Sequence, residues 1–447
     1  MEEVESLSAL PAPGHRLLVH SLLNGIGQAV PILVAIAAVP LLIRGLGTER
    51  VGLLTLSWSV IGYASLFDFG LGRALTQLVA ERRRQQGPQG DLPAAVSSAL
   101  AAMLLIGCAG AVAMLALVPW ATRVGLNISL PLQHETLAAA RLLAVGIPVV
   151  VLTSGYRGIL EAYERFDLAN AVRVPIGIST FIGPLLVMPF TRSLAWAVGV
   201  LLAARVVGLV ALMLLVKRVA PTLPRRPSIA HPSLAPVMRC GAWMTVSNIL
   251  SPLMSSADRF FISAMISASV VAYYTAPYEM VTRLMAMIAL AVATSLFPAF
   301  ARAANAADAR ILLKRGVRLI VAGFVPVILL VLVLAPFLLR LWLGETFARA
   351  STTVLRILAI GILMNGLAQA PFALIQARGR ADLTAKIHLL ELPFYLTSVF
   401  YLIRGYGIEG AAIAWTVRVG AEAVVLFAVA RYMLGDRVSV TSVTEAA

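Results

Sequence analysis

Arg141-Leu-Leu-Ala-Val-Gly-Ile147 recurs almost unchanged as Arg356-Ile-Leu-Ala-Ile-Gly-Ile362, close to half a chain later. The match continues at the same offset through the next loop, where five pairs correspond: Leu160 and Ile375, Ala162 and Ala377, Arg165 and Arg380, Asp167 and Asp382, and Leu168 and Leu383. An internal duplication explains both matches and predicts two equivalent halves that run in the same direction. Transporters of the alternating-access type are commonly built from two repeats with a binding site between them. The repeat therefore favours transport.

The composition predicts an all-α integral membrane protein. Of the 447 residues, 60% are hydrophobic and 13% are charged. Spanning a hydrocarbon core of about 30 Å takes about 20 helical residues, and apolar stretches of that length recur along the whole chain. We expect twelve transmembrane helices, six in each half, near 17–43, 52–80, 94–118, 135–157, 168–190, 194–216, 240–263, 271–299, 313–335, 351–375, 383–403 and 409–432.

These helices predict two lobes, an N-terminal lobe at 1–216 and a C-terminal lobe at 240–432. A proline-rich linker at 217–239 separates the lobes, and a tail follows at 433–447. The loops that follow the second, fourth, sixth, eighth and tenth predicted helices carry about 17 Lys and Arg, whereas the loops on the opposite side carry about 7. This bias predicts a cytoplasmic linker and cytoplasmic N- and C-termini. The net charge of +15 is then a topology signal that faces anionic lipid and does not indicate nucleic-acid binding. The two cysteines fit neither a metal spacing nor a disulfide framework.

Charged side chains inside the predicted helices are the candidates for function. Each costs roughly 2.5–3.5 kcal/mol when it faces lipid at the bilayer centre, whereas a whole fold is stabilised by about 5–15 kcal/mol. These groups must therefore line a wet cavity, pair with one another or reach the interface. The set comprises Asp68, Arg73, Arg141, Arg173, Arg205, Glu279, Arg283, Arg356, His388, Glu391, Arg418 and Glu422.

The arginines in this set outnumber the carboxylates, which favours an anionic ligand such as pyrophosphate, because the guanidinium fork matches phosphate oxygens in pairs. Arg205 and Arg418 occupy matching places near the middle of the last helix of each lobe, so their depth makes them candidate ligands. Glu279 and Arg283 stand four residues apart, as do Arg418 and Glu422, and this spacing also predicts internal ion pairs. We predict no catalytic residue, no metal site and no cofactor.

Five segments resemble the bacterial polysaccharide-biosynthesis oligosaccharide flippases. They are PLLIRGLGTERVG at 40–52, LFDFGLGRALTQLVAE at 66–81, ADRFFIS at 257–263, YYTAPYE at 273–279 and LFPAFAR at 296–302. That family belongs to the superfamily of multidrug and oligosaccharidyl-lipid exporters, which also holds the lipid II flippases. The resemblance implies two six-helix lobes that form a V-shaped central cavity. It also implies transport of undecaprenyl-pyrophosphate-linked oligosaccharide to the periplasmic leaflet of a bacterial inner membrane, for O-antigen or exopolysaccharide synthesis.

The resemblance also implies which residues line the cavity, because helices 1, 2, 7 and 8 line it in the superfamily. We expect six residues to contact pyrophosphate or sugar: Arg73, Arg283, Asn24 and Asn248 by this resemblance, and Arg205 and Arg418 by their depth. Asp68, Glu279 and Asp258 are candidates for coupling to a H⁺ or Na⁺ gradient, or else counter-ions for nearby arginines. The expected partners are membrane lipids and the polysaccharide polymerase and chain-length machinery.

Several alternatives stay open at the level of the sequence. A cation-coupled multidrug antiporter of the same superfamily is the first, although helix 17–43 carries no carboxylate. A lipid II flippase is the second, although such proteins usually have two more helices. A membrane-embedded glycosyltransferase or ligase needs catalytic side chains on sizeable external loops, and the expected periplasmic loops are short. A noncatalytic scaffold of an envelope complex would not need so many intramembrane arginines.

Overall fold

The computed structural model describes residues 30–31, 33–64, 71–84, 92–223, 250, 253–282, 285, 300, 303 and 305–435. The described residues form helices and short connecting turns, with no strand among them, and each of the twelve predicted helices overlaps a described helix. Seven of the described helices are long and apolar enough to cross a membrane. The all-α membrane fold predicted from the sequence is therefore confirmed.

The N-terminal bundle comprises a short helix Leu33–Leu46 and the helices α2 to α7. Their bounds are α2 Thr48–Ala64, α3 Leu71–Arg84, α4 Leu92–Trp120, α5 Leu130–Ala162, α6 Phe166–Val187 and α7 Leu194–Val219. A π-helical turn, η3 (Ala121–Gly125), extends α4 before the chain enters α5. Pro131 lies in the first turn of α5, where its missing N–H costs no helical hydrogen bond.

The C-terminal bundle comprises helical residues 253–265 and 268–282 together with α10 (Ala306–Leu343), α11 (Glu345–Ala377) and α12 (Ala381–Gly435). The long α12 contains two helices, because Gly407 has a φ of 58° and breaks the helical path. This break falls between the two helices predicted at 383–403 and 409–432. A positive φ is readily adopted by glycine, which has no Cβ to clash.

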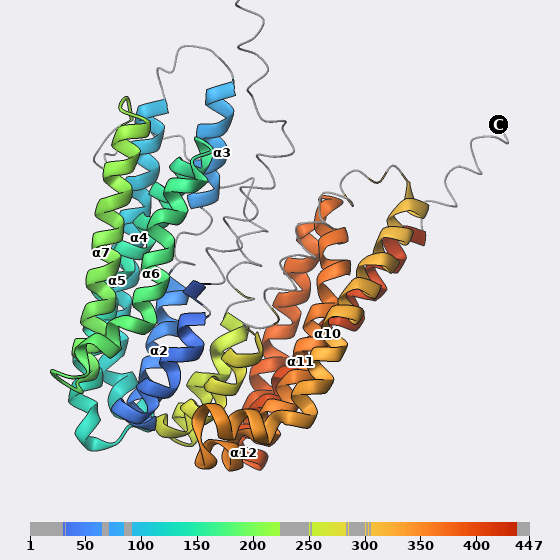
Figure 1. Ribbon diagram of the computed structural model, residues 1–447. Helices are drawn as coiled ribbons and strands as arrows, with labels where there is room; N and C mark the ends of the chain where they lie inside the picture. The colour runs from blue at the N-terminus through green and yellow to red at the C-terminus, as the bar shows by residue number, and fades with distance from the viewer. Residues whose placement is uncertain are drawn as a thin grey trace, which may run out of the picture.

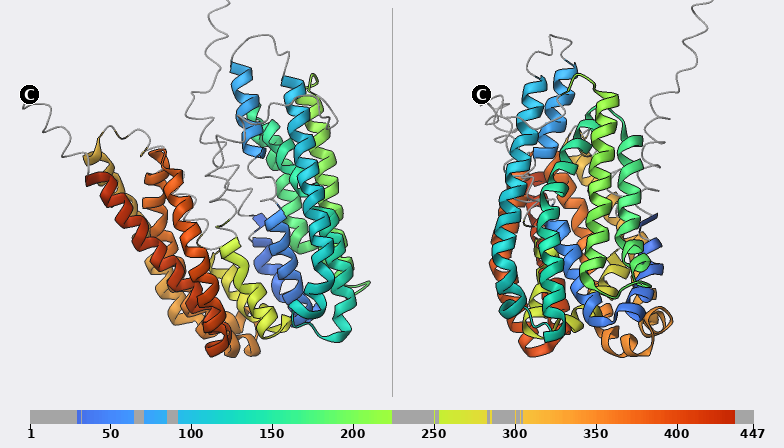
Figure 2. Two further views of the ribbon diagram at one scale, coloured as in Figure 1. Left: turned by 180° about the vertical axis from the view of Figure 1, so that it is seen from behind. Right: turned by 90° about the vertical axis from the view of Figure 1, so that its left-hand side faces the viewer.

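The two bundles form a V (Figure 1). They meet at one end and diverge toward the end where α7 and α12 finish, and the view from behind shows the same divergence (Figure 2). One hydrophobic cluster joins both bundles at their meeting end, and it includes Leu54 and Leu56 together with Met254 and Val271. A second cluster belongs to the N-terminal bundle alone. The predicted bounds of the lobes, the linker and the tail stay a prediction, because residues 224–249 and 436–447 lie outside the described part of the chain.

The internal duplication is visible in equivalent turns of the two bundles. The Arg165 N–H donates to the Leu160 carbonyl at 2.9 Å between α5 and α6, and the Arg380 N–H donates to the Ile375 carbonyl at 3.2 Å between α11 and α12. In each turn the arginine side chain also pairs with the carboxylate two residues later. Pairs of residues that correspond in the sequence repeat therefore make the same contacts.

Candidate functional site

The meeting end of the V is held by an interlobe clasp, which we define as Asn127, Ser263, Ile266 and Ala268. The Asn127 N–H donates to the Ser263 carbonyl at 3.0 Å, and the Ala268 N–H donates to the Asn127 carbonyl at 3.1 Å. The Asn127 side-chain amide donates to the Ile266 carbonyl at 2.7 Å. A single residue of the N-terminal bundle thus makes three hydrogen bonds to the turn that joins the first two helices of the C-terminal bundle.

The backbones of the two bundles approach closely beside this clasp. Gly52 of α2 faces Ala268, and a Cβ atom added to Gly52 would lie 1.9 Å from the Ala268 carbonyl oxygen. Only glycine fits there in this conformation. A second crossing point lies nearby, where the Trp342 indole N–H of α10 donates to the Ile36 carbonyl at 2.7 Å.

A buried ion-pair network extends from the clasp end between the two bundles. The Arg259 guanidinium donates to Glu279 at 2.9 Å through Nη2 and to the Ser59 hydroxyl of α2 at 3.2 Å through Nη1. The Arg259 side chain is only 7% exposed, and its guanidinium carbon lies 5.2 Å from the centre of the Tyr278 ring. Tyr63 of α2 stacks on Phe260, the next residue along the chain. Arg259 is therefore a cation placed at the contact between the lobes.

Asp258 lies beside this network but points deeper into the C-terminal bundle. Its carboxylate is fully buried and accepts a hydrogen bond from the Tyr274 hydroxyl at 2.5 Å. The other carboxylate oxygen accepts the Arg259 backbone N–H at 2.8 Å. The adjacent residues Asp258 and Arg259 therefore face different partners, with the aspartate held inside the bundle and the arginine reaching the other lobe.

A second buried cluster lies in α12, where the guanidinium of Arg418 is surrounded by acidic side chains. Arg418 Nη1 lies 3.3 Å from Glu422 and 3.7 Å from Glu391, and His388 Nε2 lies 3.1 Å from the other oxygen of Glu422. The Arg418 guanidinium carbon also lies 5.3 Å from the centre of the Tyr395 ring. The predicted pair of Arg418 and Glu422 is confirmed.

The ligand atoms of His388, Glu391 and Glu422 come within 4.8 Å of one another, a spacing that could hold a metal ion. Arg418 already places a positive charge against both carboxylates, which opposes the binding of a second cation at the same oxygens. The cluster is therefore explained as an internally neutralised charge network. We therefore assign no metal ion to this cluster.

The charge balance in the C-terminal bundle differs from the predicted excess of arginine. Among its described residues, two buried arginines, Arg259 and Arg418, stand against four carboxylates, which are Asp258, Glu279, Glu391 and Glu422. Moreover, the side chains of Arg141 and Arg356, which were counted as intramembrane candidates, are exposed on the surface of the protein. The sequence count included such surface arginines because it could not distinguish exposed from buried faces.

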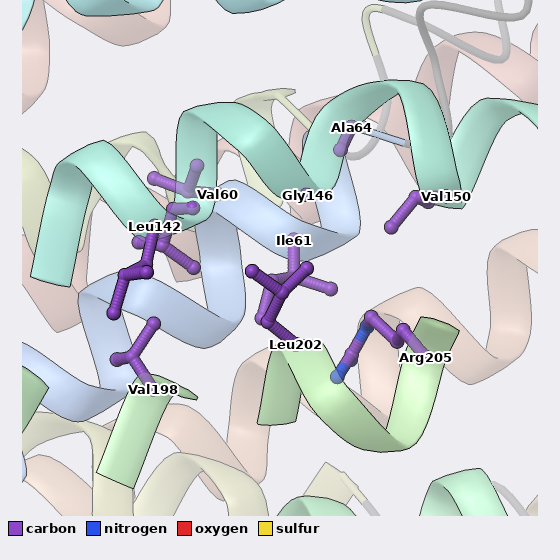
Figure 3. A pocket seen from close by; sticks show the side chains of 10 residues that line it. Val60, Ile61, Ala64, Leu142, Gly146, Val150, Val198, Leu202 and Arg205 are labelled. Atoms are coloured by element: carbon purple, nitrogen blue, oxygen red, sulfur yellow. The ribbon is translucent and has the colours of Figure 1, made fainter. Parts of the chain in front are cut away.

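Arg205 lies in the other lobe, away from the Arg418 cluster. Figure 3 shows its side chain among apolar side chains of α2, α5 and α7, including Ile61, Val150 and Leu202. Its guanidinium donates to the Leu201 carbonyl at 3.1 Å, and the adjoining cavity has a volume of about 10 Å³, enough for one water at most. Arg205 and Arg418, which both lie near the middle of the last helix of their lobe, thus have unlike surroundings. Arg205 as a ligand of the substrate stays a prediction.

The remaining predicted site residues are only partly placed. Asn24, Asp68, Asn248 and Arg283 lie outside the described residues, as does the side chain of Arg73, whose backbone belongs to α3. Glu279 contacts Arg259, and its pairing with Arg283 stays a prediction. Arg259 was missed by the sequence reasoning, although a charged Asp-Arg pair inside the apolar segment ADRFFIS was a visible signal.

Comparisons with known proteins place these features in context. The family model of the polysaccharide biosynthesis protein family matches residues 17–304. A Shigella flexneri protein described as a candidate O-antigen transporter is 31% identical over 92% of this chain and 96% of its own length.

Two solved structures of multidrug resistance MATE family transporters of the MOP superfamily share the fold at 16% sequence identity. The inward-facing one covers 92% of this chain and 98% of its own, with a TM-score of 0.77. The outward-facing one covers 93% of this chain and 94% of its own, with a TM-score of 0.68.

Proposed function

Since the chain belongs to the polysaccharide biosynthesis protein family and is a multi-pass membrane transporter, we propose that it flips undecaprenyl-pyrophosphate-linked oligosaccharide across the bacterial inner membrane. The observation that carries this proposal is the similarity to the Shigella flexneri relative, which extends over nearly the whole of both chains. In this proposal the pyrophosphate and sugars pass between the lobes while the polyprenyl tail stays in lipid. The product serves the synthesis of O-antigen or another cell-surface polysaccharide.

The proposed transport starts from a state open to the cytoplasm. The helix α7 finishes at the end at which the bundles diverge and carries Lys217 and Arg218 in its last turn, and cytoplasmic loops are enriched in Lys and Arg. The TM-score is higher with the inward-facing MATE transporter than with the outward-facing one, which supports an opening toward the cytoplasm. The clasp at the meeting end then forms the closed periplasmic gate, and both termini lie in the cytoplasm.

The Arg259 network is the proposed link between the head group and the gate. Arg259 bridges Ser59 in one lobe and Glu279 in the other, so a phosphate that competes for its donors would loosen the contact between the lobes. We propose that Arg73, Arg283, Asn24 and Asn248 contribute further contacts to the pyrophosphate or sugars. Asp258 and Glu279, with Asp68, are the proposed groups for H⁺ or Na⁺ coupling.

The flippase proposal predicts where the glycan accumulates when the protein is absent. In a deletion strain, a membrane-impermeant glycan probe is expected to label the undecaprenyl-linked glycan only after spheroplasts are opened. The wild-type gene is expected to restore labelling of intact spheroplasts. Normal labelling of intact spheroplasts from the deletion strain would remove the flippase proposal. Arrested cell-wall growth with unaffected surface polysaccharide would indicate a lipid II flippase.

Alternating access predicts that locking the clasp stops transport. After Cys108 and Cys240 are replaced by serine, the variant Asn127→Cys, Ala268→Cys is expected to cross-link between the lobes on oxidation, because the two backbones are hydrogen-bonded. Glycan export is expected to stop on oxidation and to return after reduction. The single-cysteine variants serve as controls. Undiminished export by the fully cross-linked protein would exclude opening at this end.

A cation-coupled drug antiporter is the second candidate function, and the carboxylate excess in the C-terminal bundle favours it. Antiport of a cationic dye predicts efflux that depends on the gradient and falls in Glu391→Gln and Glu422→Gln variants. The flippase proposal predicts no dye efflux above that of cells carrying an empty vector. The two proposals are therefore separated by one efflux assay in the same strains.

A further inference from the structure

A basic groove lies on the C-terminal bundle, at the end opposite to the clasp. It runs between the first turns of α10 and the last turns of α12, has a volume of about 800 Å³, and lies at the end where the bundles diverge. Its cations are Arg310, Lys314 and Arg318 on α10 and Arg431 on α12. We name these four residues, with the floor residues Val317 and Phe427, the α10–α12 groove.

The cations of the groove form one line. Arg310, Lys314 and Arg318 are spaced four residues apart, so they follow one face of α10 over about 12 Å. All four cations are exposed, and no carboxylate lines the groove within the described part of the chain. Such a line of like charges repels itself until an anion neutralises it.

One of these cations also fixes the geometry of the groove. The Arg310 guanidinium donates to the Leu434 carbonyl at 2.8 Å and so ties the start of α10 to the end of α12. Because the two helices are antiparallel, Lys314 then lies level with Arg431, and Val317 lies level with Phe427. The side chains of the two walls therefore face one another in pairs along the groove.

The character of the groove changes toward the middle of the bundle. One turn beyond Arg318, α10 exposes Val321, and two turns before Arg431, α12 exposes Val424, which are 40% and 70% exposed. The same two helices thus present charges at their outer end and bare apolar side chains further in. A soluble anion would need only the charges, whereas a phospholipid has an anionic head group and acyl chains in this order.

We propose that the α10–α12 groove binds an anionic phospholipid of the bilayer, with its phosphates on the four cations and its acyl chains along Val321 and Val424. A head group with two phosphates, as in cardiolipin, matches a cationic line of about 12 Å better than a single phosphate does. Basic pockets between helices at the cytoplasmic side of membrane proteins bind such head groups. The groove lies between α10 and α12 of one lobe, whereas the oligosaccharide is proposed to pass between the two lobes.

The test measures lipid binding to the full-length protein, delipidated in a neutral detergent. Native mass spectrometry and thermal melting are recorded with cardiolipin, with phosphatidylcholine, with undecaprenyl pyrophosphate and with inorganic pyrophosphate. The wild type is expected to bind cardiolipin and to melt at a higher temperature with it. The double variant K314Q/R318Q is expected to bind cardiolipin roughly 30-fold more weakly, since each lost cation weakens binding roughly fivefold.

A matched control removes the same charge from elsewhere at this end of the molecule. Arg315 neighbours Lys314 but does not line the groove, and Arg218 lies at the end of α7, so R218Q/R315Q is expected to bind cardiolipin like the wild type. R431Q tests the opposite wall and is expected to weaken binding as well. Because melting without lipid is measured for every variant, a folding defect is seen independently.

Three outcomes would overturn the proposal. Equal cardiolipin binding by K314Q/R318Q, R431Q and the wild type would remove the groove as the site. Equal competition by inorganic pyrophosphate would indicate a site for soluble anions. Preferential binding of undecaprenyl pyrophosphate over cardiolipin would make the groove a landing site for the carrier lipid. None of these readouts depends on transport, so the result is independent of the flippase proposal.

Discussion

Replacing Arg259 by alanine is expected to abolish glycan export and to lower the free energy of unfolding by about 3–5 kcal/mol. The guanidinium is buried, and it is the partner of Glu279 and of Ser59 in the opposite lobe. Its removal takes the Arg259 cation away from beside the Glu279 carboxylate. Removal of one member of a buried ion pair is costly because the remaining charge has lost its partner but not regained water.

Loss of stability must be separated from loss of gating. A double variant, Arg259→Met and Glu279→Met, removes both charges together, and apolar replacement of a whole buried pair is often neutral for stability. We expect this variant to reach normal levels in the membrane and still to fail in export. Glycan labelling on intact spheroplasts and detergent-extracted melting curves measure the two properties separately.

Arg340 provides a matched control for Arg259. It pairs with Glu345, but its side chain is 64% exposed, and exposed ion pairs contribute about 0–1 kcal/mol. Arg340→Ala is therefore expected to leave export and melting nearly unchanged. Normal export by the Arg259→Met, Glu279→Met variant would contradict a role of the network in coupling head group and gate.

Replacing Gly52 by alanine is expected to shift the protein away from the conformation in which the lobes are clasped. The added Cβ atom would overlap the Ala268 carbonyl oxygen, which belongs to the backbone and cannot rotate away. Overpacking of this kind costs about 1–3 kcal/mol. That cost corresponds to a roughly 5- to 150-fold change in the ratio of clasped to open states. We expect export to fall strongly while the amount of protein in the membrane stays normal.

Gly62 of the same helix is the control for Gly52. Nothing lies within 4 Å of a Cβ atom at Gly62, so alanine causes no clash there. At both positions, replacing glycine by alanine stabilises the helix by about 1 kcal/mol. The difference between the two variants therefore reports the clash alone. Cross-linking yield between cysteines at 127 and 268 measures the clasped fraction directly. If Gly52→Ala cross-links as well as Gly62→Ala does, the close approach at Ala268 does not control the gate.

Much of the fold could be predicted because it depends on local patterns. The apolar stretches identified the helices, and the repeated segments at 141–147 and 356–362 identified two equivalent halves. The pair of Arg418 and Glu422 could also be predicted, because residues four apart share one face of a helix. For the same reason the four-residue spacing of Arg310, Lys314 and Arg318 is visible in the sequence, although the sequence does not show that α12 lies opposite.

The candidate site could be predicted only in part. Arg259 contacts Glu279 on the next helix and Ser59 in the other lobe, partners that are 20 and 200 residues away. No spacing rule connects positions so distant. Likewise, Arg205 and Arg418 lie near the middle of the last helix of their lobes, yet one lies among apolar side chains and the other among carboxylates. Side chains that pack around a residue come from several helices, so a similar depth in the helix does not give the same environment.

The sequence by itself determined the membrane environment, the helices, the duplication and, through its similarity to known proteins, the family. These properties follow from hydrophobicity and local spacing, which each segment carries independently of its neighbours. The tertiary structure alone decided which charges are paired, which glycine allows the lobes to touch, and where Asn127 closes one end. Such contacts form between distant segments, and their energies depend on burial and distance, which exist only after the helices have packed.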